Sequence, residues 1–256
     1  MERLVKVVFF VGLLIYFLMA VVARTPAEWG AWVALRAVPN LSLNGVSGSL
    51  WAGKAASAQV VVNRETMDLG ALQWRLDGLS LLLLKACMNV RSTTIQGEVC
   101  YGLGGRVTIN KLLVDQVPAK VFYNNPGVQI GGTGNATVQH AELTLRNGGQ
   151  VEIKDLAGSV TAQRMAINVG TGWFSLGSFA ADATENGRGG VALNITDIEG
   201  DFSVQVQGDL MVGEQPQLSG VITPKETAPQ PLKDALGVFM EMQDDGSYKL
   251  EWPIGG

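Results

Sequence analysis

Residues 7–23 form an uninterrupted apolar run near the start of the chain, preceded by Arg3 and Lys6. A helix rises about 1.5 Å per residue, so about 20 residues cross roughly 30 Å of hydrocarbon, and residues 4–23 supply this length if Lys6 extends toward the headgroups. A buried core helix is disfavoured because such a run leaves no polar face for solvent. We therefore expect a transmembrane anchor within residues 1–24, with a cleaved signal peptide as the alternative.

The charges beside this run predict its orientation. Basic residues next to a membrane span favour the cytoplasmic side, and Arg3 and Lys6 precede the run, while Arg24 opposes them only weakly from the other end. The pattern predicts a single-pass protein of a bacterial inner membrane, with a cytoplasmic N-terminus and a periplasmic main domain.

A short second helix is expected within the juxtamembrane segment 25–40. Thr25 and Glu28 have the spacing of a capping box, and Pro26 fits the first helical position, which predicts a helix that runs to about Ala37. Trp29 and Trp32 then fall on one side of it. Indole rings favour the boundary between lipid and water, so these tryptophans are candidates for membrane contact. The alternative is that they cover the end of the folded domain.

The two cysteines, Cys87 and Cys100, flank a polar stretch from Asn89 to Gly97 that has the length of a loose hairpin connection. In an oxidising periplasm, a bridge between them would stabilise the fold by roughly 3 kcal/mol. Two free buried thiols are the alternative. The absence of a Cys-x-x-Cys motif in the sequence disfavours a zinc knuckle and a redox enzyme.

Composition excludes several partners and favours strands. The first 24 residues hold three of the 19 basic residues and one of the 23 acidic residues, so the remainder carries 16 against 22, a net charge of −6. Such a domain is a poor partner for nucleic acid. Charged residues make up only 16% of the chain, whereas glycine occurs 32 times. Much glycine with little charge is typical of many short strands joined by tight turns, in one all-β domain or in two sheets that share a core.

Alternating apolar and polar residues support this interpretation. Leu143 and Leu145 alternate with polar neighbours, as do Val204 and Val206. Glycine-containing turn signals separate such segments; they lie at 124–127, 131–134, 147–149, 186–187 and 189–190. The pattern predicts a mainly β fold over residues 41–256. We expect a long, curved, largely antiparallel meander sheet, open or partly closed, with one or two short helices.

Three local predictions complete the fold. The apolar run Leu79 to Leu84 is interpreted as a buried strand, with a short helix as the alternative. Residues 232–239 are expected to form a short helix after a proline-rich connection at 223–231. Finally, Asp244-Asp245-Gly246 lies between two alternating arms and predicts a terminal hairpin over 240–252.

Catalytic patterns are lacking in the sequence. The chain has one histidine, His140, so a triad would lack its base unless this residue served, and its position on a strand favours a structural role. The sequence shows no metal-ligand spacing and no complete phosphate-binding loop. We therefore expect no cofactor, no metal and no enzyme.

One segment carries a family resemblance. Residues 45–55, with the sequence Gly-Val-Ser-Gly-Ser-Leu-Trp-Ala-Gly-Lys-Ala, resemble the opening motif of protein N of the bacterial type II secretion system. The likeness extends to residues 72–76, to Leu236-Gly237 and to residues 245–250. The N-terminal anchor, the length and the glycine-rich strands also agree, so the resemblance covers most of the chain.

The resemblance implies an inner-membrane accessory subunit. Members of that family help to export folded proteins from the periplasm across the outer membrane through contacts with other inner-membrane subunits, and they bring no catalytic residue to carry over. In the motif, glycines at 48 and 53 around Leu50 and Trp51 suit a strand that packs a large ring while its neighbours approach closely, and Trp74 lies one strand later. We expect these residues to found the fold.

A second function class stays open. A meander with one apolar face and few helices to cover it is similar to the AsmA-like proteins, which bind or bridge lipids in an apolar groove. A lipid ligand in such a groove is the alternative to a role limited to protein contacts.

Overall fold

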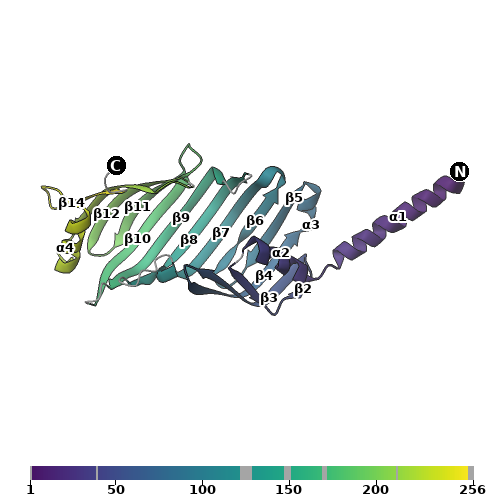
Figure 1. The fold of residues 1–256 in the computed structure, drawn as a ribbon, viewed down its shortest axis with the longest axis horizontal. Coiled ribbons are helices and arrows are strands. Elements are labelled where there is room, and N and C mark those ends of the chain that lie inside the picture. Colours follow the sequence, from purple (N-terminus) through teal and green to yellow (C-terminus); the bar gives the residue numbers. More distant parts are fainter. Residues whose placement is uncertain are drawn as a thin grey trace.

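The computed structural model describes residues 2–38, 40–121, 129–146, 151–168, 172–211 and 213–252, without the side chains of 2–8, 15, 18, 19, 37, 235, 238 and 239. It shows a long antiparallel sheet of 15 strands (Figure 1). The strands are β1 Leu41–Asn44, β2 Ser47–Gly48, β3 Ala52–Val62, β4 Glu65–Asp77, β5 Lys85–Arg91, β6 Ile95–Gly102, β7 Arg106–Pro118, β8 Gln129–Leu145, β9 Val151–Asn168, β10 Trp173–Glu185, β11 Val191–Glu199, β12 Phe202–Leu210, β13 Gln217–Pro224, β14 Glu241–Met242 and β15 Tyr248–Trp252.

The strand order follows the chain. From β3 to β13 each strand pairs with the next one in sequence, β1 and β2 both pair with β3, and the sheet finishes in the order β13-β15-β14. The described helices are α1 Glu2–Ala23, α2 Ala27–Ala37, α3 Gly78–Leu82 and α4 Gln230–Phe239, with 3-10 turns η1 Leu103–Gly105 and η2 Ala119–Val121. The prediction of a mainly β meander is thus confirmed, and the sheet is open, with β1 and β14 at its two ends.

Side chains of paired residues in antiparallel strands lie on the same face of a sheet, and the pairing from β7 to β15 shows that apolar residues gather on one face. We call it the apolar face. A row of paired small and apolar residues crosses it from β7 to β15: Leu112, Val138, Gly158, Ala183, Leu193, Gly208, Leu218 and Trp252. The opposite, polar face carries rows such as Asp182, Asn194, Gln207, Ser219 and Glu251.

The apolar face has two separate cores, one towards each end of the sheet. The first is built from Ala58, Met67, Leu69, Val117 and Val121, so η2 covers β3 and β4. The second is built from Phe202, Val204, Val206, Ala228 and Leu232, where α4 and the segment before it cover β12. Burial of apolar area at roughly 25 cal/mol per Å² holds these coverings in place.

Between the two cores the apolar face is lined by smaller residues. A row of paired residues runs from Val114, which packs against the first core, to Ile195, which packs against the second; between them lie Ala136, Val160 and Ala181. Val160 keeps 43% of its surface exposed in the described part of the chain. The apolar face is therefore well covered at its ends and less covered in the middle.

The structure corrects the prediction for the segment Leu79–Leu84. It forms α3 and the turn that follows, so the prediction of a buried strand is wrong. The cause is local: the Asp77 carboxylate accepts a hydrogen bond from the backbone N–H of Leu79 at 3.0 Å, and the Ser80 hydroxyl donates to the Asp77 carbonyl at 2.6 Å. These hydrogen bonds pair polar groups in the first turn of the helix and so favour a helix over a strand in this segment.

Two further predictions are corrected. Residues 131–134, expected as a turn, lie inside β8, and the polar stretch Asn89 to Gly97 is mostly strand, with only residues 92–94 between β5 and β6. Glycine in strands often marks a bulge, and the β8–β9 register does shift between Gly131 and Thr133. The expected turns at 124–127 and 147–149 lie outside the described residues.

Helix α2 and the C-terminal elements lie where the sequence predicted them. Helix α2 ends at Ala37 as predicted, but its capping box is wrong: Pro26 is the N-cap and makes no side-chain cap bond, while the Thr25 hydroxyl donates to the Val21 carbonyl at 3.3 Å. Helix α4 confirms the helix near 232–239. The β14–β15 pair around Asp245 confirms the terminal hairpin.

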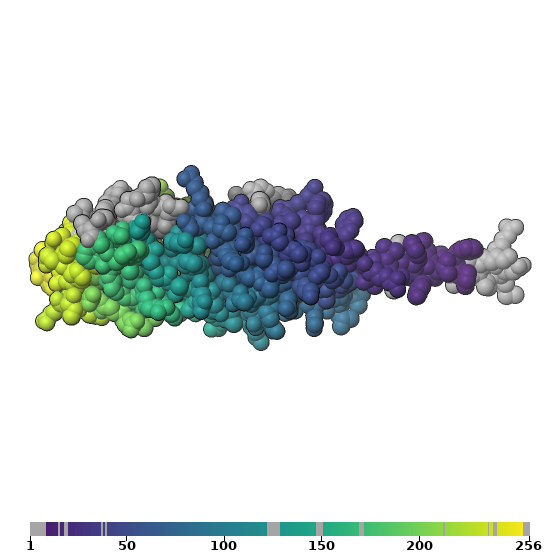
Figure 2. Space-filling view, turned by 90° about the horizontal axis from the view of Figure 1, so that it is seen from below, coloured from purple at the N-terminus to yellow at the C-terminus, as the bar shows by residue number. Residues whose placement is uncertain are grey.

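Helix α1 projects from the end of the sheet that holds the first strands (Figures 1 and 2). Judged on the described residues, none of the helices has both the length and the apolar character that a membrane crossing requires.

Candidate functional site: the helix–sheet junction and the polar face

The family-like motif at 45–55 forms the tight connection between β2 and β3. Gly48 has a φ of +98°, and a Cβ there would lie 2.6 Å from the Ala52 carbonyl oxygen. Both facts require glycine, because L side chains rarely adopt this backbone conformation and the facing backbone leaves no room. The turn therefore depends on Gly48.

Trp74 of β4 covers Gly53, its cross-strand partner in β3. A Cβ on Gly53 would lie 2.2 Å from Cζ2 of the Trp74 ring, so the indole occupies the space that any larger residue would need. The Trp74 Nε1 donates to the Leu50 carbonyl at 3.2 Å. The Leu50 side chain in turn reaches α2, where its Cδ1 would meet a Cβ on Gly30 at 3.0 Å. This group joins β3, β4 and α2.

Trp51 joins the same strands to α1. Its Nε1 donates to the Val22 carbonyl at 2.9 Å, which satisfies a carbonyl in the last turn of α1. Its own carbonyl accepts from the Leu76 N–H at 2.8 Å, and the neighbouring Leu50 N–H donates to the Thr25 carbonyl at 2.9 Å. We call this set of contacts the helix–sheet junction. The structure thus brings Gly48, Leu50, Trp51, Gly53 and Trp74 together.

Trp29 and Trp32 lie apart from the junction, on the outer side of α2. Both are exposed, whereas Ala27 and Ala31 on the inner side are buried. The Arg36 guanidinium stacks 3.9 Å from the centroid of the Trp32 ring. Trp29 lines an open hollow of about 590 Å³ together with Phe17 and Val21 of α1. These tryptophans therefore face outward beside the base of α1.

The polar face has a basic hollow over β3–β8, with a volume of about 1110 Å³. Four cationic side chains line it, against one carboxylate, that of Glu98; the cations are Lys54, Arg75, Arg91 and Lys111. The excess of positive charge makes this hollow suited to an acidic segment of a partner.

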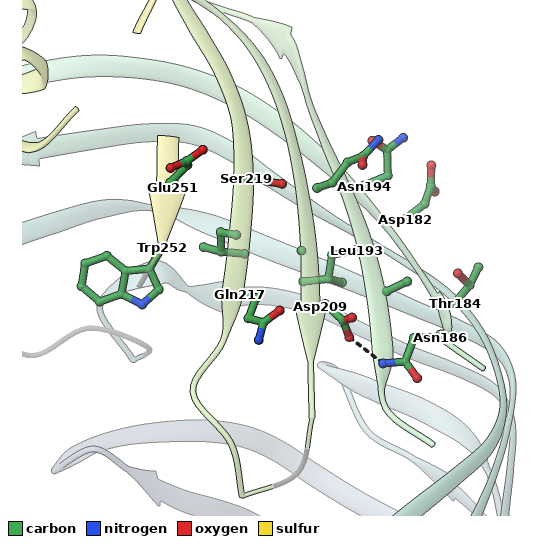
Figure 3. A pocket seen from close by; sticks show the side chains of 14 residues that line it. Asp182, Thr184, Asn186, Leu193, Asn194, Asp209, Gln217, Ser219, Glu251 and Trp252 are labelled. Carbon is green, nitrogen blue, oxygen red and sulfur yellow. Dashed lines mark hydrogen bonds between the residues drawn. The ribbon is translucent and has the colours of Figure 1, made fainter. Parts of the chain in front are cut away.

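A second hollow on the polar face, over β10–β15, is acidic (Figure 3). It measures about 770 Å³, and its carboxylates are Asp182, Asp209 and Glu251. Asp209 accepts a hydrogen bond from the Asn186 amide at 2.6 Å and forms an ion pair with Arg188. Sequence reasoning missed both hollows, because their charges come from strands that only the register brings side by side.

His140 belongs to a hydrogen-bonded chain on the polar face. Its Nδ1 lies 2.8 Å from the Asn110 Oδ1, and the Asn110 amide donates to Glu98 at 3.1 Å. The Nε2 lies 3.8 Å from an Asp155 carboxylate oxygen. These neighbours agree with a structural histidine. Within the described residues no group of three or more His, Cys, Asp or Glu side chains could hold a metal ion.

The disulfide lies close to the junction. Cys87 of β5 and Cys100 of β6 are directly paired across the two strands and are joined by a disulfide bond. The bridge ties together the pair of strands that follows α3.

These features define a class of protein: an open β-meander tied at one end to an apolar helix, with its charged side chains gathered on one face. Residues 39–251 match the family model described as type II secretion system (T2SS), protein N, and the chain belongs to this family. Proteins of this family are components of type II secretion and are not known as enzymes. Membership suggests the bacterial envelope as the location. No curated protein and no solved structure shows a significant match to the chain.

Proposed function

We propose that this chain is an accessory subunit of the inner-membrane part of the type II secretion system, assisting export of folded proteins from the periplasm across the outer membrane. It acts through contacts with other inner-membrane subunits and without turnover. The observation that carries the proposal is the family match, which spans the sheet from β1 into β15. The family implies partnership with other secretion subunits.

We further propose that α1 is a single-pass anchor, with residues 1–24 as cytoplasmic tip and span, 25–40 as juxtamembrane helix and 41–256 as periplasmic domain. Two features support this arrangement. Arg3 and Lys6 precede the apolar run in the sequence, and the large apolar side chains described in α1, such as Phe10 and Phe17, are exposed on a helix that projects from the sheet. Exposed apolar surface of this extent fits a lipid environment.

The partner surface proposed here is the basic hollow. Its cations come from neighbouring strands of one sheet, so the backbone already holds them side by side and binding orders only their side chains. A photoreactive residue in place of Arg91, in the full chain in its membrane, should crosslink to another inner-membrane secretion subunit. The matched control replaces Asp244, which is exposed in the terminal hairpin.

Two results would speak against the proposal. One is equal crosslinking from both positions, which would mean that the hollow is not a specific contact. The other is a deletion strain that exports its usual folded proteins normally, which would remove the secretion role itself.

A second candidate function is binding or bridging of lipid, as in the AsmA-like proteins. The specific observation that favours it is the apolar face, where Val160 is 43% exposed between two covered cores. An acyl chain lying along the paired residues Ala136, Val160 and Ala181 would bury this strip. Native mass spectrometry of the chain released from detergent should then show a mass increment of one lipid, reduced by Val160→Asp. A clean unliganded mass for the unaltered chain would exclude this function.

A further inference from the structure

Five leucines at one end of the sheet are largely exposed. Each keeps between 64% and 80% of its surface open, and they are Leu79, Leu82, Leu83, Leu84 and Leu103. We call this group the leucine rim. Scattered single leucines on a surface need no explanation, but a group of exposed leucines marks a site of interaction with another protein or with a membrane.

The rim is held on a rigid support. Ser80, the buried member of α3, donates to the Asp77 carbonyl at 2.6 Å and accepts from the Cys87 N–H at 3.2 Å, which ties α3 to the disulfide-linked β5. Asp77 caps the helix by accepting from the Leu79 N–H at 3.0 Å. The leucines are thus presented by a structured turn.

Leu84 lies in the turn that follows α3 and has an uncommon backbone conformation. Its φ is +56°, a left-handed conformation that glycine adopts freely and that residues with a side chain adopt rarely.

The rim lies next to the base of α1. Trp51, which donates to the Val22 carbonyl of α1, also has its ring 3.7 Å from where a Cβ on Gly78, the first residue of α3, would lie. Lys85 pairs with Gly102, so Leu84 and Leu103 lie at the same end of the β5–β6 hairpin. Figure 1 shows α3 at the end of the sheet from which α1 leaves.

We propose that the leucine rim inserts into the surface of the same membrane that α1 enters, on its outer leaflet, as a second anchoring point. This inference rests on the proposed membrane anchoring of α1. Lys85 beside the rim and Arg24 at the end of α1 place positive charge where anionic headgroups lie. Two membrane contacts, α1 and the rim, fix the tilt of the sheet relative to the bilayer. Anchoring by α1 alone would leave this tilt free.

The test uses the full chain in vesicles of phosphatidylethanolamine and phosphatidylglycerol. A nitroxide label is attached at Leu83→Cys, where it is the only free thiol because Cys87 and Cys100 are bridged. Collision of the label with oxygen, which concentrates in lipid, is compared with collision with a water-soluble nickel complex. The matched controls are Val11→Cys in α1 and Asn194→Cys on the polar face.

We expect the label at Leu83 to resemble that at Val11 and to differ from that at Asn194. Burial of one leucine shifts the ratio of inserted to free rim roughly 10- to 100-fold, so adding Leu82→Ser should return much of the label at Leu83 to water. Circular dichroism of each variant, compared with the unaltered chain, verifies that the sheet is intact.

Three outcomes would overturn the inference. A label at Leu83 in water while Val11 is in lipid leaves the anchor standing and removes the rim. Labels at both positions in water remove the anchor and the rim together, without touching the secretion role tested by crosslinking. Spin–spin broadening at Leu83 that disappears on dilution with unlabelled chain would assign the rim to contact between two copies.

Discussion

Replacement of Gly53 by alanine tests whether the Trp74 ring on bare backbone holds the first strands together. The new Cβ would lie 2.2 Å from Cζ2 and 2.5 Å from Cε2 of the ring, distances that real atoms do not keep. The indole must move, and its movement breaks the 3.2 Å hydrogen bond to the Leu50 carbonyl.

The expected cost follows from these two events. Overpacking costs about 1–3 kcal/mol and a lost hydrogen bond about 0.5–1.5 kcal/mol, so the β2–β4 region should lose about 2–4 kcal/mol. A factor of ten corresponds to about 1.4 kcal/mol, so local opening of these strands should become roughly 30- to 1000-fold more frequent.

Hydrogen exchange of the full chain, followed by mass spectrometry, measures this opening. Amides of β3 and β4 should lose protection, whereas those of β12 and β13, which belong to the second core, should keep it. The matched control is Gly134→Ala in β8, where a Cβ would have its nearest neighbours at 3.8 Å and φ is unstrained, so little should change.

A double-mutant cycle with Trp74→Ala decides the cause. Without the ring, Gly53→Ala has nothing to displace and should cost far less than in the unaltered chain. Equal costs in the two backgrounds, within about 0.5 kcal/mol, would refute the steric explanation.

Three further predictions concern the disulfide, an acidic residue and the junction. Replacing both Cys87 and Cys100 by alanine should lower the free energy of unfolding by roughly 3 kcal/mol, measured with urea, and an unchanged midpoint would contradict it. The pKa of Asp197 is lowered chiefly by the Val204 N–H, and also by Lys225 and Ser203, against the effect of burial. Its stabilisation is present above the unfolded pKa of about 3.9 and is lost as pH falls through the folded value, so Asp197→Asn should lower stability at neutral pH and weaken its acid dependence; a parallel pH curve would count against this. Trp51→Phe removes the hydrogen-bond donor to the Val22 carbonyl and should destabilise the junction by about 0.5–1.5 kcal/mol. Trypsin should then cleave faster after Arg24, and an unchanged rate would show that the bond does not restrain the junction.

Sequence reasoning succeeded where the signal repeats locally. Val204 and Val206 alternate with polar residues and lie buried in β12, and Asp244-Asp245-Gly246 forms the turn it predicts. It failed at Leu79–Leu84, where an apolar run without a period fits a strand or a helix. Asp77 followed by Ser80 is a helix-capping signal that the sequence does contain. Only the folded structure shows that both residues make the capping hydrogen bonds.

The sequence by itself determined the class of fold, the apolar N-terminal helix and the motif that places this chain in its family, because period-two alternation, hydrophobic length and glycine spacing act over a few neighbouring residues. Only the tertiary structure decided the function-bearing surfaces. The basic and acidic hollows arise from the register of separate strands, and Trp51 reaches Val22 across 29 positions of sequence. The leucine rim, too, is exposed only because the fold turns Ser80 of α3 toward the protein and leaves the leucines on the outside. Contacts between residues distant in the chain depend on the register of every strand pair between them, and a slip of one residue would move all the side chains of a strand to the other face.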